Sequence, residues 1–168
     1  MIAVDTNLLV YAHRSDTSFH EPAKRCIASL AEARAAWAIP WPCLHEFFSV
    51  VTRPRLFDPP TACADAVRQV DMWLESPSLT VLGEGPGYWP VLRDLVTSGR
   101  VVGPLVHDAR IAAICVFHGV RELWTADRDF TRFDALVVRN PLVVDAANER
   151  APAYGRRRVV RRRHRRAG

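Results

Sequence analysis

The sequence predicts an α/β fold in which a doubly wound parallel sheet carries helices on both faces. Two observations support this prediction. Short apolar segments alternate with longer segments of helical periodicity, and polar, glycine or proline residues bound the apolar segments. Alternating strands and helices form parallel sheets that the helices cover on both faces. A length of 168 residues with 49% hydrophobic residues is enough for a buried core, so a wholly disordered chain is excluded.

The first third of the chain predicts two strands and three helices. Residues 2–4 are a short apolar strand that ends at an aspartate, and the apolar run 8–11 is the first turn of a helix. Residues 21–34 place apolar side chains at i, i+4, i+7 and i+8, as an amphipathic helix does. The second strand, 36–39, is closed by a proline. A further proline suits the first turn of the next helix, which Pro54 ends.

The remaining elements repeat the same alternation. Thr61 is placed to cap a helix that reaches Glu75. A strand at 79–82 leads through a glycine-rich loop into a helix over 88–98. A second connection, rich in glycine and valine, precedes a helix that opens near Asp108. The last two strands are predicted at 123–125 and 136–138.

Charge divides the chain into two parts. All 18 acidic residues lie at or before Glu149, whereas nine of the 23 lysines and arginines lie at or beyond Arg150. Residues 1–149 therefore carry a net charge of −4, and the last 19 residues carry +9. We expect a folded domain over 1–144 and a basic, disordered tail over 145–168, because arginine-rich low-complexity sequence cannot bury enough apolar surface to fold alone.

The cysteines and the N-terminus predict a cytoplasmic protein. Four cysteines in a chain of this length are too few for a disulfide scaffold, and their spacing is not that of zinc ligands. We expect them to be small buried residues of a reducing compartment. The N-terminus lacks the basic region of a signal peptide. No uncharged apolar run approaches the roughly 18 residues of a membrane span.

Four acidic residues end predicted strands or begin the helices that follow them. They are Asp5, Glu46, Asp108 and Asp127. Ligands of open parallel sheets bind at the carboxyl ends of the strands, so we expect these four side chains to converge. Two carboxylates about 4 Å apart repel by roughly 4 kcal/mol at an effective dielectric near 20, so such a cluster must take up protons or bind cations.

The chemistry of these acids favours a hard divalent cation. Carboxylate oxygens without histidine or cysteine at ligand spacing suit Mg²⁺ or Mn²⁺ better than Zn²⁺. Such a cation lowers the pKa of a bound water and screens phosphate charge, which suits phosphodiester hydrolysis. An aspartate after a strand is often only a helix cap, and Asp108 could be one. Asp129 lies two residues beyond Asp127 and could substitute for it or assist it.

Four sequence blocks carry these acids in a characteristic order and spacing. The blocks are VDTNLLVY at 4–11, LHEF at 44–47 followed by VTRP at 51–54, HDARIA at 107–112 and LWTADRDF at 123–130. Together they resemble the motifs of PIN-domain ribonucleases, in particular the VapC toxins of bacterial toxin–antitoxin pairs. The resemblance covers residues 1 to about 144. It implies a PIN-like fold, a homodimer, and a Mg²⁺- or Mn²⁺-dependent endoribonuclease that cleaves tRNA or a ribosomal RNA loop by metal-activated water.

The same resemblance implies roles for individual residues. The four acids align with the family's catalytic quartet, with Asp5 and Asp108 as direct metal ligands and Glu46 and Asp127 completing the pocket. The side chains expected to orient these carboxylates are Thr6, Asn7 and Thr125. The implied partner is a small VapB-like antitoxin that lies across the active site. From its position beside a proposed ligand, we expect Arg110 to contact phosphate or to pair with the acids.

Three other functions can be weighed from the sequence, and Asn7 argues against the first of them. A phosphatase with an aspartyl nucleophile would need a second acid two residues after Asp5, where this chain has Asn7. A non-catalytic RNA-binding module would depend on the tail, whose arginines would add salt-dependent phosphate contacts with little sequence selection. A housekeeping RNA-processing nuclease would share the acidic site with a toxin. The tail itself is equally consistent with an extension that only aids solubility.

Overall fold

Five parallel strands form the sheet of this protein, whose computed structural model describes residues 1–143. The strands are β1 (Ile2–Val4), β2 (Trp37–Pro40), β3 (Leu79–Leu82), β4 (Glu122–Trp124) and β5 (Val137–Arg139). Their order in the sheet is β3-β2-β1-β4-β5, and every neighbouring pair is parallel. The chain winds outward from β1 on one side and then on the other, which confirms the predicted doubly wound sheet. The predicted tail, 145–168, lies outside the described residues.

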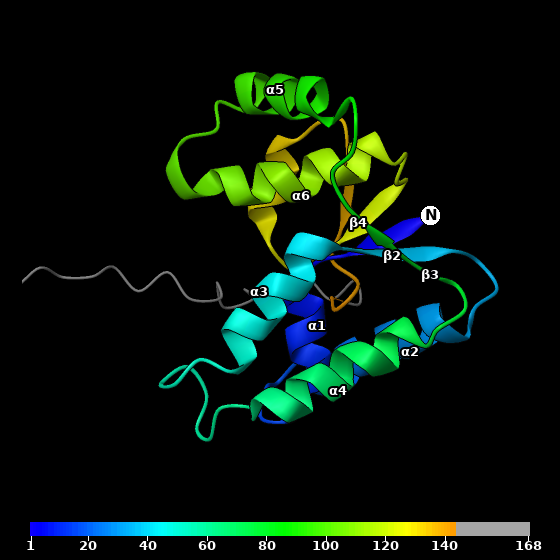
Figure 1. The fold of residues 1–168 in the computed structure, drawn as a ribbon, viewed down its shortest axis with the longest axis vertical. Helices are drawn as coiled ribbons and strands as arrows, with labels where there is room; N and C mark the ends of the chain where they lie inside the picture. The colour runs from blue at the N-terminus through cyan, green and yellow to red at the C-terminus, as the bar shows by residue number, and fades with distance from the viewer. Residues whose placement is uncertain (144–168) are drawn as a thin grey trace, which may run out of the picture.

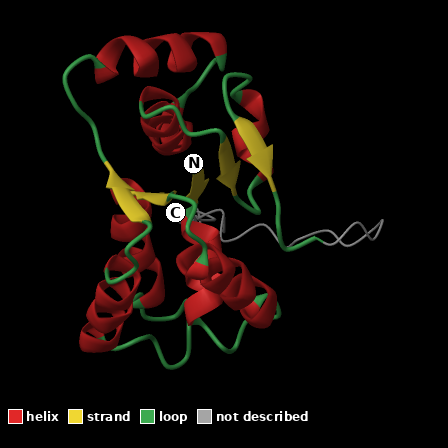
Figure 2. Cartoon of the chain, turned by 90° about the vertical axis from the view of Figure 1, so that its right-hand side faces the viewer, coloured by secondary structure: helices red, strands yellow, loops and turns green. Residues whose placement is uncertain are grey.

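Helices cover both faces of the sheet, as predicted (Figures 1 and 2). They are α1 (Thr6–His13), α2 (His20–Glu32), α3 (Trp41–Val51), α4 (Cys63–Leu74), α5 (Tyr88–Ser98) and α6 (Val106–Phe117), with the short 3₁₀ turns η1 (Gly103–Leu105) and η2 (Arg128–Arg132). In Figure 1, α5 and α6 lie above the sheet and α1 to α4 lie below it. Within residues 1–143, no helix is long and apolar enough to cross a membrane.

The central strand β1 explains where polar side chains can emerge. Ala3 and Val4 are fully buried, because a strand enclosed on both faces must be apolar throughout. β1 pairs with β4 so that Val4 lies opposite Trp124. The residues that follow these two strands, Asp5 and Thr125, therefore leave the sheet side by side. The sheet thus brings together two positions that are 120 residues apart in the sequence.

Two predictions about individual residues are wrong. Thr61 does not cap α4: the capping position is Ala62, which makes no side-chain cap hydrogen bond. The Thr61 hydroxyl instead accepts a hydrogen bond from Arg14, which lies beyond the end of α1. The four cysteines are free, but only Cys43 and Cys115 are buried. Cys63 is exposed, because it opens α4 on the side that faces solvent.

Candidate active site

Four acidic side chains from four separate parts of the fold line one cavity of about 80 Å³. They are Asp5, Glu46, Asp108 and Asp127. The first follows β1, the second lies in the second turn of α3, the third in the first turn of α6, and the fourth directly precedes η2. Thr6 and Asn7 also line the cavity. The structure therefore brings together the acids that the sequence singled out.

Hydrogen bonds fix one oxygen of the Asp5 carboxylate. Oδ2 accepts a hydrogen bond of 2.6 Å from Nδ2 of Asn7 and one of 2.7 Å from the hydroxyl of Thr125. Asn7 is held in turn, because its Oδ1 accepts from the backbone N–H of Ala126 at 3.0 Å. Asp5 and Thr125 are 4% and 1% exposed, so water does not compete for these hydrogen bonds.

The third predicted orienting residue, Thr6, and two backbone hydrogen bonds hold the rim of the cavity. The Thr6 hydroxyl donates to Oε2 of Glu46 at 2.7 Å, which links the start of α1 to α3. The backbone N–H of Asp127 donates to Oγ1 of Thr125 at 2.9 Å, and Oδ1 of Asp127 accepts from the N–H of Asp129 at 2.8 Å. One threonine therefore contacts both Asp5 and the backbone of Asp127.

Burial raises the pKa of Asp5 from its ordinary 3.8 to about 7. Loss of hydration disfavours the charged carboxylate, and this is the largest cause. The hydrogen bond from Thr125 opposes the increase, and the charges of Glu46 and Asp127 add to it. The sequence predicts that repulsion among the acids makes the cluster take up protons or bind cations. Burial is instead the main cause of the raised pKa, and repulsion contributes less.

The donor set of the cavity fits a hard divalent cation. All its charged side chains are carboxylates, and oxygen ligands are those that Mg²⁺ and Mn²⁺ prefer. Among the described residues, no three His, Cys, Asp or Glu side chains are grouped as a ready-made metal cage. Mg²⁺ commonly keeps several waters and binds one or two carboxylates, so a preformed cage is not required. The side chain of Asp108 lies partly inside, with its Oδ2 shielded from solvent.

Two residues predicted to assist the site point elsewhere. The carboxylate of Asp129 lies 3.5 Å from the guanidinium of Arg132, and Asp129 does not line the cavity. Nε of Arg110 donates to Oε1 of Glu84 at 2.5 Å, so this arginine pairs with an acid outside the quartet. The expectation that Asp129 substitutes for Asp127 therefore has no support in the geometry.

Sequence reasoning missed two side chains near Asp5. Sγ of Cys43 lies 3.7 Å from Oδ1 of Asp5. Burial raises the pKa of the Cys43 thiol well above its ordinary value, so the thiol can act as a hydrogen-bond donor. Tyr11 is 5% exposed, and its pKa is raised by burial and by the charges of Asp127 and Asp5. Helical spacing was the available signal, since Cys43 precedes Glu46 by one turn and Tyr11 follows Asn7 by one turn.

Comparison with known proteins identifies the family. The family model described as "PIN domain" matches residues 2–136, which contain all four acids of the cavity. The chain is a PIN-domain protein. Ribonuclease VapC48 of Mycobacterium tuberculosis is 31% identical over 137 residues, which cover 82% of this chain and 94% of that protein. Ribonuclease VapC43 of the same organism is 36% identical over 142 residues, covering 84% of this chain and 96% of the relative. The chain therefore also belongs with the VapC ribonucleases.

Solved structures show the same PIN-domain fold. The VapBC2 complex of Rickettsia felis, bound to a promoter DNA fragment, matches with a TM-score of 0.62 and 20% identity over 83% of this chain and 98% of that chain. VapC20 of Mycobacterium tuberculosis, described as a toxin that cleaves the sarcin–ricin loop, matches with a TM-score of 0.58 and 20% identity over 78% and 93% of the two chains.

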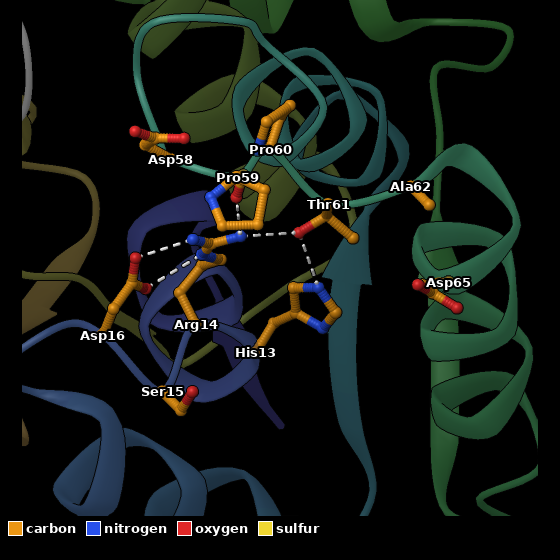
Figure 3. A pocket seen from close by; sticks show the side chains of 10 residues that line it. All are labelled: His13, Arg14, Ser15, Asp16, Asp58, Pro59, Pro60, Thr61, Ala62 and Asp65. Atoms are coloured by element: carbon orange, nitrogen blue, oxygen red, sulfur yellow. Dashed lines mark hydrogen bonds and ion pairs between the residues drawn. The ribbon is translucent and has the colours of Figure 1, made fainter.

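A larger cavity of about 640 Å³ lies at the opposite end of α1 from the acids of the PIN domain. Figure 3 shows Arg14 in its wall, between Asp16 and Thr61. The guanidinium donates to both carboxylate oxygens of Asp16, to the hydroxyl of Thr61 and to the carbonyl of Pro59, and it stacks on the ring of Phe57. The N–H groups of the Arg14 guanidinium are used in hydrogen bonds within the protein. Arg14 therefore stabilises the loop before α4 and does not form a phosphate-binding site.

Replacing Arg14 by alanine is expected to lower the free energy of unfolding by about 1–3 kcal/mol, because the hydrogen bonds of a largely buried charge are removed and the carbonyl of Pro59 loses this donor. Lysine keeps the charge but not the planar fork, so Arg14→Lys should recover only part of the stability. Urea unfolding measures both effects. Equal stability of wild type and Arg14→Ala would contradict the role of Arg14 in stabilising the loop before α4.

Proposed function

We propose that this PIN-domain protein is a metal-dependent endoribonuclease that cleaves structured RNA, such as tRNA or ribosomal RNA, as the toxin of a toxin–antitoxin pair. The observation that carries the proposal is the cavity that four carboxylates from four elements line together. Two curated relatives are named ribonucleases, and one solved neighbour is described as a toxin that cleaves a ribosomal RNA loop. These names support RNA as the substrate class.

The residues of the cavity have distinct parts in the proposed reaction. Asp5 and Asp108 would hold the cation, and Glu46 and Asp127 would complete the acidic wall. A bound Mg²⁺ or Mn²⁺ supplies a water of lowered pKa and screens the charge of the scissile phosphate. Asn7 and Thr125 hold Oδ2 of Asp5 in place before any substrate arrives. This prior order matters, because side chains that need no reorganisation contribute most to catalysis.

The first test is cleavage of total cellular RNA by the purified protein, with mapping of new 5′ ends. We expect cleavage with Mg²⁺ or Mn²⁺, none with a chelator, and at least a ~10³-fold slower reaction for Asp108→Asn, since loss of a metal ligand removes the activated water. Asp94→Asn is the matched control, because Asp94 is an exposed acid of α5 that pairs with Arg93. Cleavage that survives both the chelator and Asp108→Asn would refute the metal mechanism.

The same preparation separates the nuclease from a non-catalytic RNA-binding module. A binding module needs no acidic quartet, so Asp108→Asn would leave its activity unchanged and no new 5′ ends would form with any metal. A growth assay separates a toxin from a housekeeping nuclease, because both would cleave RNA. Expression of a toxin should arrest growth, and co-expression of a neighbouring small antitoxin gene should relieve the arrest, whereas a housekeeping nuclease should not arrest growth.

We also propose that the protein forms a homodimer, binds a VapB-like antitoxin and acts in the cytoplasm. A solved neighbour is a VapBC complex, which supports the antitoxin as partner. Large apolar side chains of α5 and the segment before η1 are exposed, with Trp89 at 65% and Val102 at 73%, which supports a second copy as their cover. The four free cysteines suit a reducing compartment. Light scattering tests the dimer, which a mass equal to one chain would exclude.

A further inference from the structure

The two carboxylate oxygens of Asp5 have unequal surroundings. Oδ2 accepts two short hydrogen bonds, from Asn7 and Thr125. Oδ1 faces the thiol of Cys43, whose Sγ lies 3.7 Å away. A thiol is a weak donor, so Oδ1 keeps more of its capacity to bind a cation than Oδ2 does. The side chain beside Oδ1 therefore affects how this oxygen is presented to the cavity.

Cys43 belongs to a double link between two helices. Cys43 and Glu46 are three residues apart on α3, and residues at this spacing lie on one helix face. Their partners, Asp5 and Thr6, are consecutive residues at the start of α1. The thiol thus couples the position of α3 to the carboxylate of Asp5, just as Thr6 couples α1 to Glu46.

We propose that Cys43 is a positioning residue, whose S–H group orients Oδ1 of Asp5 for cation binding. The inference rests on the proposed metal-dependent function but concerns one step of it, the capture of the cation. Cys43 is fully buried in the protein and does not line the cavity, so it acts through Asp5 and not as a ligand. A side chain of the same size without a donor would leave the packing intact and release Oδ1.

The experiment measures Mn²⁺ binding to the full-length protein by electron paramagnetic resonance, without RNA. Cys43→Ala and Cys43→Val remove the donor, and Cys43→Ser keeps one. We expect the dissociation constant for Mn²⁺ to rise about three- to tenfold in the alanine and valine variants and to stay within about twofold of wild type in the serine variant. In an Asp5→Asn background, Cys43→Ala should cause no further change, because the group that it orients is gone.

Cys115→Ala is the matched control, because Cys115 is equally buried, in α6, whereas the thiol that hydrogen-bonds Asp5 is that of Cys43. It should lower thermal stability as Cys43→Ala does and leave Mn²⁺ affinity unchanged. Unchanged Mn²⁺ affinity in Cys43→Ala would overturn the positioning role, and so would an equal weakening in Cys43→Ser. The nuclease proposal fails separately, when wild-type protein binds Mn²⁺ but cleaves no RNA. In that case the Mn²⁺ affinities of the variants still decide the role of Cys43.

Discussion

Asp5→Asn is expected to abolish RNA cleavage and, at the same time, to stabilise the metal-free protein above pH 7. Cleavage should fall by at least ~10³-fold, because an amide is a poor ligand for the cation that activates water. The structure should be retained, since the amide oxygen can still accept the hydrogen bonds from Asn7 and Thr125. The gain in stability comes from removing a carboxylate that is costly to ionise in its buried position.

The pH dependence of this gain has a definite sign. The pKa of Asp5 rises from its ordinary 3.8 to about 7 in the folded protein. Between these values the folded state binds more protons than the unfolded state, so the free energy of unfolding falls as pH rises through this window. Each tenfold change in proton affinity is worth about 1.4 kcal/mol, so Asp5 alone costs about 4 kcal/mol above pH 7.

Urea unfolding at pH 4.5 and pH 8, with a chelator present, measures this effect as the difference between Asp5→Asn and wild type. The difference in favour of the variant should be only about 1 kcal/mol at pH 4.5 and should reach about 4 kcal/mol at pH 8. Asp94→Asn, at an exposed position of α5, should show no such change with pH. A constant difference at both pH values would contradict the high pKa of Asp5.

Removal of residues 150–168 is expected to weaken RNA binding by about 10²-fold at low salt and to leave the cleavage chemistry intact. The removed residues carry a net charge of +9. Residues 1–149 carry −4, so without the tail the protein and the RNA phosphates have net charges of the same sign. Basic side chains bind nucleic acid by releasing counterions, so the salt dependence of binding should become less steep. For single-stranded RNA the slope should fall by about 0.7 for each phosphate that the truncated protein no longer neutralises.

Fluorescence anisotropy with labelled RNA across a range of salt concentrations measures the affinity and its slope. The titrations use an Asp108→Asn background, so that the RNA stays intact. Replacing the tail arginines by lysine should preserve the salt slope, and replacing them by glutamine should reproduce the truncation. Affinity and slope that do not change on truncation would show that the tail is an extension without a role in RNA binding.

The sheet and the four acids were predictable from the sequence for the same reason. A strand buried on both faces leaves an apolar run with a sharp polar end, and Ile2–Val4 followed by Asp5 shows both features. Parallel pairing then sends the polar ends to one edge. β4 and β5 each begin and end one residue away from the predicted positions, which changes nothing at this edge.

The missed features depend on contacts that local sequence does not encode. Thr61 has a hydroxyl that could cap a helix, but this hydroxyl accepts a hydrogen bond from Arg14, which is 47 residues away in the sequence. The turn η2 is too short for a helical period, and it forms where Asp127 accepts from the backbone of Asp129. Cys43 looked like an ordinary core residue, because its closeness to Asp5 follows from how α3 packs on α1.

Under the proposed function, the pairing of β1 with β4 also determines when the active site can form during synthesis. Thr125 reaches Asp5 only after the strand before it has joined the sheet, and residues 126 and 127 follow directly behind. A growing chain on the ribosome that ends before β4 contains Asp5 but lacks its hydrogen-bond donor Thr125 and the acid Asp127. The proposed ribonuclease would therefore stay inactive during synthesis until nearly the whole domain has been translated.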